Sequence, residues 1–203
     1  ALQSITVNQT YNNSNNEQFR LHNLYGPTEA SIDVTYYATQ AGHAVFIGKP
    51  IANTRTYILD EEKCPVAVGA VGELYLGGAG LALGYLNREE LTAERFVEND
   101  FATEDDIKNG YTKLYKTGDL AQWTEDGYIA YRGRNDDQVK IRGYRIELGE
   151  IESRIREVVG IEQACVLAKT RDTDIGSNKY LVAYYSVRAG HDTAEVKIVS
   201  ALS

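Results

Sequence analysis

The sequence predicts an α+β fold made of two consecutive units, and three patterns along its 203 residues support this. Up to about residue 135, short apolar segments alternate like strands and are separated by glycine-rich turns, which favours a small barrel or sandwich. Beyond that point apolar residues recur at helical spacing, and two further apolar segments follow. We therefore expect a short-stranded, β-barrel-like unit over residues 1–135 and a small, truncated α+β unit over residues 136–203.

The first unit is expected to consist of short strands with one helix. Residues 89–96 have a helical pattern, and Asp126-Gly127 is typical of a tight hairpin turn. The asparagine-rich segment 8–18 is polar and is expected to be a surface loop. Apolar runs or alternation place the strands at residues 32–34, 45–47, 55–59 and 72–76 and within residues 111–131.

The run 133–152 predicts a strand, a turn and a helix start in quick succession. Val139 and Ile141 alternate with cationic residues, so a strand here buries one face and presents positive charge on the other. Gly143 breaks this strand. Acidic residues then occupy positions where a helix N-terminus favours negative charge, namely Glu147, Glu150 and Glu152.

The rest of the second unit is predicted to contain a helix, two strands and the start of another helix. Gly160 is placed to cap the first helix, and the second begins near Asp192. Strands are expected at residues 164–168 and 180–187, with a loop over 170–178 between them. The apolar repeat of the first helix consists of Leu148, Ile151, Ile155 and Val158.

Charge and composition exclude several classes of function. A net charge of −8 and a pI near 5.0 argue against a nucleic-acid partner, which usually requires a basic face. No apolar run approaches the roughly 20 residues that cross a bilayer, and no signal peptide opens the sequence, so we expect a cytoplasmic protein without a membrane partner. Cys64 and Cys165 lie in unlike surroundings and the histidines are scattered, which predicts neither a disulfide framework nor a zinc site.

The first motif with chemical potential is Asn23-Leu24-Tyr25-Gly26-Pro27-Thr28-Glu29. Glycine and proline fix a tight loop that presents a ring, a hydroxyl and a carboxylate. The ring of Tyr25 can stack on a base, Thr28 can contact a phosphate oxygen, and Glu29 can hold Mg²⁺. The alternative is a simple turn without a ligand.

A second motif is Tyr115-Lys116-Thr117-Gly118-Asp119-Leu120. A carboxylate held after a glycine turn, here Asp119, can accept hydrogen bonds from both hydroxyls of a ribose. The alternative for this motif in isolation is a turn aspartate with a structural role. A glycine-rich run over residues 72–86 invites comparison with a dinucleotide-binding turn, but the parallel strand–helix–strand context is missing.

Together these runs resemble the adenylation domains of nonribosomal peptide synthetases, which are adenylate-forming enzymes. The four runs, at residues 23–29, 72–86, 115–120 and 133–152, stand in the order and approximate spacing of that family, and the resemblance extends from about Arg20 to the end. It implies catalytic roles for Thr28, near the α-phosphate, and for Glu29, on Mg²⁺. It further implies a nucleotide site made of Tyr25, Gly26, Asp119, Tyr131 and Arg134.

The resemblance also assigns roles in conformational change and acyl transfer. Asp136 corresponds to the hinge about which the small lobe rotates between the two half-reactions. Lys140 and Gly143 would line the route of a phosphopantetheine thiol. The run 72–86 is mainly structural in that family, and Leu83 stands where the family usually has arginine. The alternative for Asp136 is an ordinary linker between two units.

The substrate is predicted from three positions that line the side-chain pocket in the family. They are Leu24, Ile32 and Asp33. Two aliphatic walls and one carboxylate suit a small side chain that donates a hydrogen bond, and this triplet resembles that of serine-activating domains. Threonine is the nearest competitor, a basic amino acid could also pair with Asp33, and Asp33 could instead face solvent.

The implied reaction has two steps, formation of an aminoacyl-AMP from ATP and an amino acid and transfer to a carrier-protein thiol. The implied partners are a peptidyl carrier domain and a condensation domain of the same synthetase. The family's upstream phosphate loop and its downstream Asn-Gly-Lys segment are missing, and the chain lacks methionine altogether, so we expect an internal fragment that is inactive alone. The asparagine-rich segment is similar to cyanobacterial synthetases such as those that make microcystins. The alternatives are an acyl-CoA synthetase and a non-catalytic nucleotide-binding or interaction module.

Overall fold

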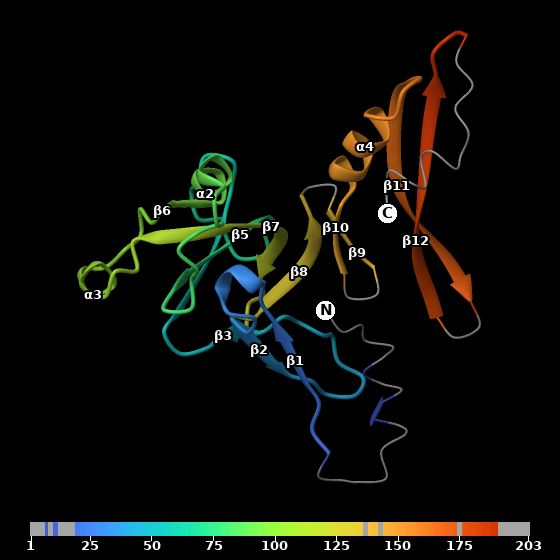
Figure 1. Cartoon of the computed structure of the whole chain (residues 1–203). Helices are drawn as coiled ribbons and strands as arrows, with labels where there is room; N and C mark the ends of the chain where they lie inside the picture. The colour runs from blue at the N-terminus through green and yellow to red at the C-terminus, as the bar shows by residue number, and fades with distance from the viewer. Residues whose placement is uncertain are drawn as a thin grey trace. The chain divides into compact units, whose positions relative to one another are not determined.

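The computed structural model of the chain describes residues 7, 10–11, 19–135, 138–141, 144–173 and 176–190. The chain divides into two compact units, residues 1–135 and 136–203 (Figure 1). Sheets and a few short helices are mixed in both units, so the predicted α+β class is confirmed. Four sequence predictions lie wholly or mostly outside the described residues: the loop over 8–18, of which the structure describes only residues 10–11, the roles of Asp136 and Gly143, and the helix near Asp192.

A small antiparallel sheet opens the first unit. It consists of β1 (His22–Tyr25), β2 (Thr35–Ala38) and β3 (Lys49–Pro50), in that order. Alternate residues of β1 point into and out of the unit, because successive side chains of a strand lie on opposite faces. Asn23 is 3% exposed, and its Nδ2 donates to the carbonyl of Phe46 at 2.7 Å. This hydrogen bond fixes the strand that ends at Tyr25.

A larger antiparallel sheet follows, with β7 at its centre. One edge of β7 pairs with β5, and the other edge pairs with β6 along its first part and with β8 along its last part. Residues Gly48 and Ile129 form an isolated bridge that joins this sheet to the small one, as expected of a barrel-like unit with short strands. The strands are β4 (Thr54–Leu59), β5 (Gly72–Gly78), β6 (Phe96–Glu98), β7 (Lys113–Trp123) and β8 (Ile129–Arg134).

Two short α-helices and a 3₁₀ turn also lie in the first unit, within residues 19–135. They are η1 (Thr28–Ala30), α2 (Glu89–Arg95) and α3 (Glu104–Lys108). A reciprocal capping box between Thr103 and Asp106 starts α3, which satisfies two of the backbone donors that a helix start leaves open. The central apolar core includes Tyr25, Val34, Ile47, Ile58, Leu74, Leu76, Phe96, Tyr115, Ala121 and Ile129.

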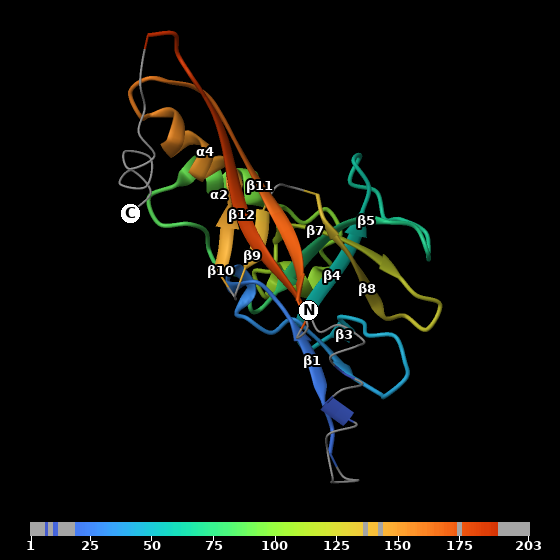
Figure 2. The ribbon, with the colours of Figure 1, turned by 90° about the vertical axis from the view of Figure 1, so that its right-hand side faces the viewer.

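Within its described residues, the second unit combines two hairpins with one helix. Figure 2 shows β11 (Ile161–Thr173) and β12 (Gly176–Val187) running side by side, and α4 (Leu148–Arg156) contacts β11. A second hairpin joins β9 (Gln138–Ile141) to β10 (Tyr144–Glu147). The buried face of α4 and strand β11 of the longer hairpin form a separate core, which includes Leu148, Ile155, Ile161 and Val166.

Most of the predicted elements are present, and three expectations are wrong. The strands at 55–59 and 72–76, the helix at 89–96 and the turn at Asp126-Gly127 are confirmed. Residues 32–34 do not form a strand, because Ser31 and Ile32 adopt left-handed backbone at φ 61° and 76°. Residues 45–47 form no strand, and the isolated bridge next to them is at Gly48. The loop expected over 170–178 is instead taken up by longer strands whose pairing continues to Thr173 and Gly176.

Candidate active site

A two-residue bulge in β7 lies at the centre of the candidate site. Glu73 of β5 is opposite Leu120, whereas Tyr75 is opposite Lys116, so the partner strand accommodates two extra residues between these pairs. Gly118 lies in the bulge with φ 74°, a backbone angle that L side chains rarely adopt. Bulges re-aim side chains and are common beside active sites. Here the bulge leaves Asp119 without a register partner in β5, while Asp119 still pairs with Arg134 of β8.

Hydrogen bonds from neighbouring groups hold the bulge in one conformation. Thr117 is 2% exposed; its Oγ1 donates to the carbonyl of Leu74 at 2.7 Å and accepts from the backbone N–H of Asp119 at 2.9 Å. The backbone N–H of Gly118 donates to Glu73 Oε1 at 2.9 Å. These three bonds hold the backbone at Gly118 and Asp119 and so position the Asp119 carboxylate.

Three of the predicted nucleotide-binding residues meet at that carboxylate. The hydroxyl of Tyr25, at the end of β1, donates to Asp119 Oδ2. Arg134, directly across from Asp119 in the register of β7 and β8, lies with Nη1 2.7 Å from Asp119 Oδ1. The side chains of Asp119 and Arg134 are 8% and 11% exposed. Three segments distant in the sequence thus form one buried, hydrogen-bonded cluster.

The electrostatics of this cluster keep Tyr25 in its neutral form. Burial raises the pKa of Tyr25 well above its usual value, and the neighbouring Asp119 carboxylate raises it further. The Tyr25 hydroxyl therefore remains a hydrogen-bond donor at neutral pH. Asp119 can accept more bonds than these two, because an ionised carboxylate offers about four lone-pair positions.

The loop from Gly26 to Asp33 is closed by backbone hydrogen bonds. The N–H of Val34 donates to the carbonyl of Tyr25 at 2.9 Å, and the N–H of Ile32 donates to the carbonyl of Pro27 at 3.1 Å. A Cβ at position 26 would lie 2.2 Å from the carbonyl oxygen of Ile32, so only glycine fits there. The predicted nucleotide residue Gly26 therefore has a steric role in closing the loop.

Thr28 and Glu29 lie on η1, the short turn that follows Gly26 and Pro27. The side chain of Thr28 is exposed, whereas Glu29 is half-buried. Glu29 Oε1 accepts a 2.7 Å hydrogen bond from the hydroxyl of Tyr85. Glu29, which sequence reasoning assigned to a metal, is therefore held by Tyr85 from the glycine-rich run.

The three predicted substrate positions are at the surface of this unit. Leu24 is 53% exposed, Ile32 is 68% exposed, and Asp33 is exposed as well. Leu24 lies on the outer face of β1, and the other two lie at the left-handed end of η1. A surface position agrees with the alternative in which Asp33 faces solvent in this chain, and it leaves the substrate assignment a prediction.

The other predicted residues differ in what the structure describes. Tyr131 lies on β8, is 38% exposed, and is close enough to Tyr25 to contribute to the rise of its pKa. The backbone of Lys140 lies in β9. Asp136 and Gly143 are outside the described residues. The hinge and the thiol route therefore stay predictions.

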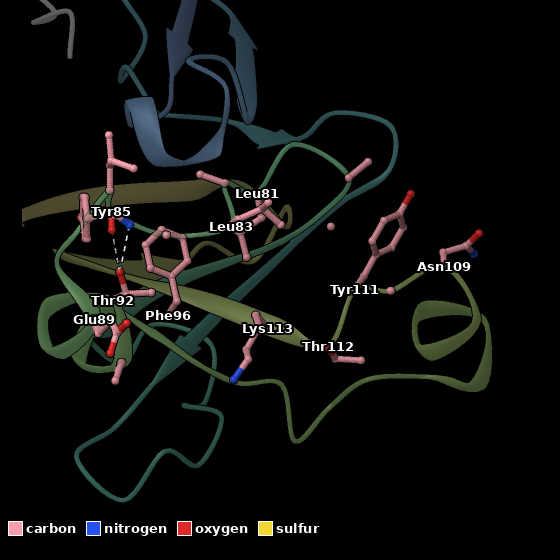
Figure 3. A pocket seen from close by; sticks show the side chains of 17 residues that line it. Leu81, Leu83, Tyr85, Glu89, Thr92, Phe96, Asn109, Tyr111, Thr112 and Lys113 are labelled. Atoms are coloured by element: carbon pink, nitrogen blue, oxygen red, sulfur yellow. Dashed lines mark hydrogen bonds between the residues drawn. The ribbon is translucent and has the colours of Figure 1, made fainter.

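Sequence reasoning missed Thr117, Glu73 and Tyr85, which support the predicted residues. A signal was available for Tyr85, because it is an aromatic residue directly after the last glycine of the glycine-rich run. Tyr85 also lines a pocket of about 960 Å³, between the loop 78–86, helix α2 and residues 109–113 (Figure 3). None of the residues predicted to bind nucleotide or substrate lines this pocket.

Within the part of the chain that the structure describes, no group of three or more His, Cys, Asp or Glu side chains could hold a metal ion. Cys64 and Cys165 are both free and exposed. None of the described helices has the length and apolar character that crossing a membrane requires.

Comparison with known proteins gives consistent matches. A family model described as AMP-binding enzyme matches residues 5–86. The chain is 51% identical to tyrocidine synthase 3 of Brevibacillus parabrevis over 166 residues, which are 81% of this chain and 2% of that protein. The chain thus spans a small part of the length of the curated relatives it matches.

Two solved structures have the same fold. The adenylation domain AlmE of Vibrio cholerae, in complex with glycyl-adenosine-5'-phosphate, matches all of this chain with a TM-score of 0.81 and 29% identity. PA1221, an NRPS protein containing adenylation and PCP domains, matches 93% of this chain with a TM-score of 0.76 and 31% identity. In both cases the chain covers 37% of the solved chain.

Proposed function

We propose that the protein containing this chain activates an amino acid as an aminoacyl-AMP. The reason is that the chain belongs to the AMP-binding, adenylate-forming family and represents part of a nonribosomal peptide synthetase adenylation domain. The observation that carries this proposal is the buried cluster of Tyr25, Asp119 and Arg134. A carboxylate held between a neutral donor and a guanidinium is suited to receive the hydroxyls of a ribose.

Each described residue has a role in this proposal. Asp119 accepts hydrogen bonds from the ribose, while Tyr25 and Arg134 fix its orientation. The exposed hydroxyl of Thr28 contacts the α-phosphate, and Tyr131, partly exposed beside the cluster, contacts the nucleotide. AlmE, the solved relative with glycyl-adenosine-5'-phosphate, supports placing such a ligand at this fold.

The donor chemistry of the site also fits Mg²⁺ brought by the nucleotide. Magnesium prefers oxygen ligands and is usually held by one or two carboxylates together with substrate phosphates. Glu29 supplies such a carboxylate, half-buried, one residue after the proposed phosphate contact. Bound there, the ion would neutralise part of the triphosphate charge.

The reaction needs positioning more than a protein nucleophile. The carboxylate of the amino acid attacks the α-phosphorus of ATP, the bond to the β-phosphate oxygen breaks, and pyrophosphate leaves. The chain's part in this step is to orient the ribose through Asp119 and the phosphate through Thr28. A fixed hydrogen-bond network reduces the reorganisation needed at the moment of reaction.

The substrate we propose is serine. Leu24 and Ile32 supply aliphatic walls, and Asp33 supplies an acceptor for a side-chain hydroxyl. A large apolar side chain would leave that carboxylate without a partner once the pocket is closed, which costs about 1–3 kcal/mol. Threonine carries the same hydroxyl and is the nearest competitor.

The second half-reaction transfers the aminoacyl group to the phosphopantetheine thiol of a peptidyl carrier domain, and a condensation domain then uses the product. PA1221, the solved relative that contains adenylation and PCP domains, supports this partner. We further propose that residues 1–135 belong to the large lobe and residues 136–203 to the small lobe. In this scheme the lobes rotate about Asp136, and Lys140 and Gly143 line the thiol route.

The test is amino-acid-dependent exchange of pyrophosphate with ATP by a longer polypeptide that contains residues 1–203 and the rest of an adenylation domain. We expect serine to support the fastest exchange, with threonine second. Asp119→Asn should lower kcat/KM for ATP at least tenfold, because the ribose loses its charged acceptor. Exchange that is fastest with a large apolar amino acid would contradict the serine assignment. If no amino acid supports exchange, the proposed function is contradicted.

A further inference from the structure

The later part of the glycine-rich run, residues 78–85, forms a clamp on η1, the turn that carries Glu29, and on Ser31 directly after it. Three hydrogen bonds connect the two segments. Ser31 Oγ donates to the carbonyl of Gly80 at 2.7 Å, and the N–H of Ala82 donates to the carbonyl of Glu29 at 2.8 Å. The third is the 2.7 Å bond from the Tyr85 hydroxyl to Glu29 Oε1. The first two fix the backbone of the turn, and the third fixes the Glu29 side chain.

Tyr85 is itself held by the helix that follows it. Its backbone N–H donates to Thr92 Oγ1 at 2.9 Å, as the dashed lines in Figure 3 indicate, and its ring packs edge-on against Phe96 at 5.6 Å. Gly84 permits this approach, because a Cβ there would lie 2.4 Å from the Thr92 methyl group. Both the backbone and the ring of Tyr85 are therefore fixed independently of Glu29.

The Tyr85 hydroxyl stays protonated near neutral pH and can therefore donate a hydrogen bond to Glu29. Burial raises the pKa of Tyr85 far above its usual value, and its hydrogen bonds to neighbouring groups, Glu29 among them, raise it further. A neutral hydroxyl that donates to a carboxylate orients it and leaves its negative charge free to attract a cation, whereas a charged donor would neutralise it.

We propose that Tyr85 is a positioning residue for the metal-side carboxylate. Its hydroxyl holds one oxygen of Glu29 and thereby orients the carboxylate toward the Mg²⁺ of bound MgATP. This inference rests on the proposed function, since it requires Glu29 to contact the metal–nucleotide complex. It assigns the glycine-rich run a role in the chemistry of the site, where sequence reasoning predicted a structural one.

The experiment measures nucleotide binding by calorimetry, with a longer polypeptide that contains residues 1–203 and the rest of an adenylation domain. The variants are Tyr85→Phe, Glu29→Gln and the double variant, each titrated with ATP in Mg²⁺ and with ATP in EDTA. Tyr85→Phe keeps the ring that packs on Phe96 and removes only the hydroxyl. Tyr111→Phe is the matched control, because Tyr111 lines the same pocket as Tyr85.

We expect Glu29→Gln to weaken MgATP binding about tenfold or more and Tyr85→Phe to weaken it about three- to tenfold. Neither variant should change binding of ATP in EDTA by more than about twofold, since the Asp119 cluster remains intact. The double variant should bind MgATP no more weakly than Glu29→Gln, because Tyr85 acts through Glu29. Tyr111→Phe should bind both forms as the parent does.

The outcomes separate the two proposals. If Glu29→Gln weakens MgATP binding and Tyr85→Phe does not, or if their effects multiply in the double variant, the role of Tyr85 is wrong while the proposed function stands. If Glu29→Gln itself leaves MgATP binding unchanged, the metal role of Glu29 fails and this inference fails with it. Should Tyr85→Phe not fold, Tyr85→Leu provides the second variant, since it also removes the hydroxyl that holds Glu29 and should likewise weaken MgATP binding selectively.

Discussion

The two halves of the candidate site differ in how firmly the fold defines them. The strand cluster, consisting of Tyr25, Thr117, Asp119 and Arg134, is buried and its members are hydrogen-bonded to one another or to strand backbone. The substrate turn, residues 26–33, presents exposed side chains and two successive left-handed residues. Sheet packing fixes the conformation of the strand cluster, whereas hydrogen bonds within the loop fix the conformation of the substrate turn.

This difference matches the two tasks in the proposed function. The ribose of ATP is the same for every substrate, and a rigid, prearranged acceptor suits it. The amino acid varies between adenylation domains, and loops on a rigid scaffold are where such variation is tolerated. The strand cluster should therefore dominate stability, while changes in the turn should act mainly on substrate choice.

The largest expected effect is that of Asp119→Asn. Removing one charge of a buried pair leaves Arg134 without its counter-charge and costs about 3 kcal/mol or more. Urea denaturation of the 203-residue chain measures the loss. The control is Glu98→Gln, which breaks the exposed pair with Lys113 and should cost less than about 1 kcal/mol. Equal losses in the two variants would show that burial of the Asp119–Arg134 pair does not decide its contribution.

A smaller loss is expected where the two halves meet, at Gly26. Gly26→Ala places a methyl group against the Ile32 carbonyl and the Val34 side chain, which should cost about 2 kcal/mol and open the substrate turn. Gly149→Ala is the matched change in open space within α4, and there alanine should be neutral or stabilising by up to about 1 kcal/mol. Thermal unfolding of both variants checks the contrast, and a neutral Gly26→Ala would contradict the tight closure of the turn.

Elements with strong local signals could be predicted from the sequence. The helix at 89–96, the strands at 55–59 and 72–76 and the Asp126-Gly127 turn depend on propensity and periodicity, which short segments carry by themselves. The strand expected at 32–34 was wrong because apolar alternation cannot reveal left-handed backbone at Ser31 and Ile32. The length of β11 and β12 was underestimated because cross-strand pairing extends strands through polar residues.

The site shows the same limit at the level of contacts. The motifs predicted that Tyr25, Asp119 and Arg134 belong together, and the structure brings them into hydrogen-bonding contact. The sequence gives no sign that β7 bulges at Thr117, because a bulge depends on the register of two strands. The Tyr85–Glu29 bond joins residues 56 positions apart, a separation that no local pattern reports.

A third prediction compares the same substitution in the two halves. Thr117→Val removes a buried hydroxyl that hydrogen-bonds the backbone carbonyl of Leu74 and the backbone N–H of Asp119. The free energy of unfolding should fall by about 1.5 kcal/mol, because both backbone groups lose a partner. Thr28→Val removes an exposed hydroxyl from the substrate turn and should change stability by less than about 0.5 kcal/mol. Urea denaturation measures both, and a larger loss for Thr28→Val would reverse the assignment of rigid and adaptable halves.

The smallest effect expected is a gain, at Ile32. A β-branched residue in left-handed backbone is strained, and the 68% exposure of Ile32 means that little packing compensates for this in the chain itself. Ile32→Asn should raise the free energy of unfolding by about 0.5 kcal/mol, because asparagine tolerates this conformation. Val68→Asn, at an exposed position without a left-handed backbone, should give no gain. If thermal unfolding finds the two variants alike, the left-handed backbone at Ile32 is not strained.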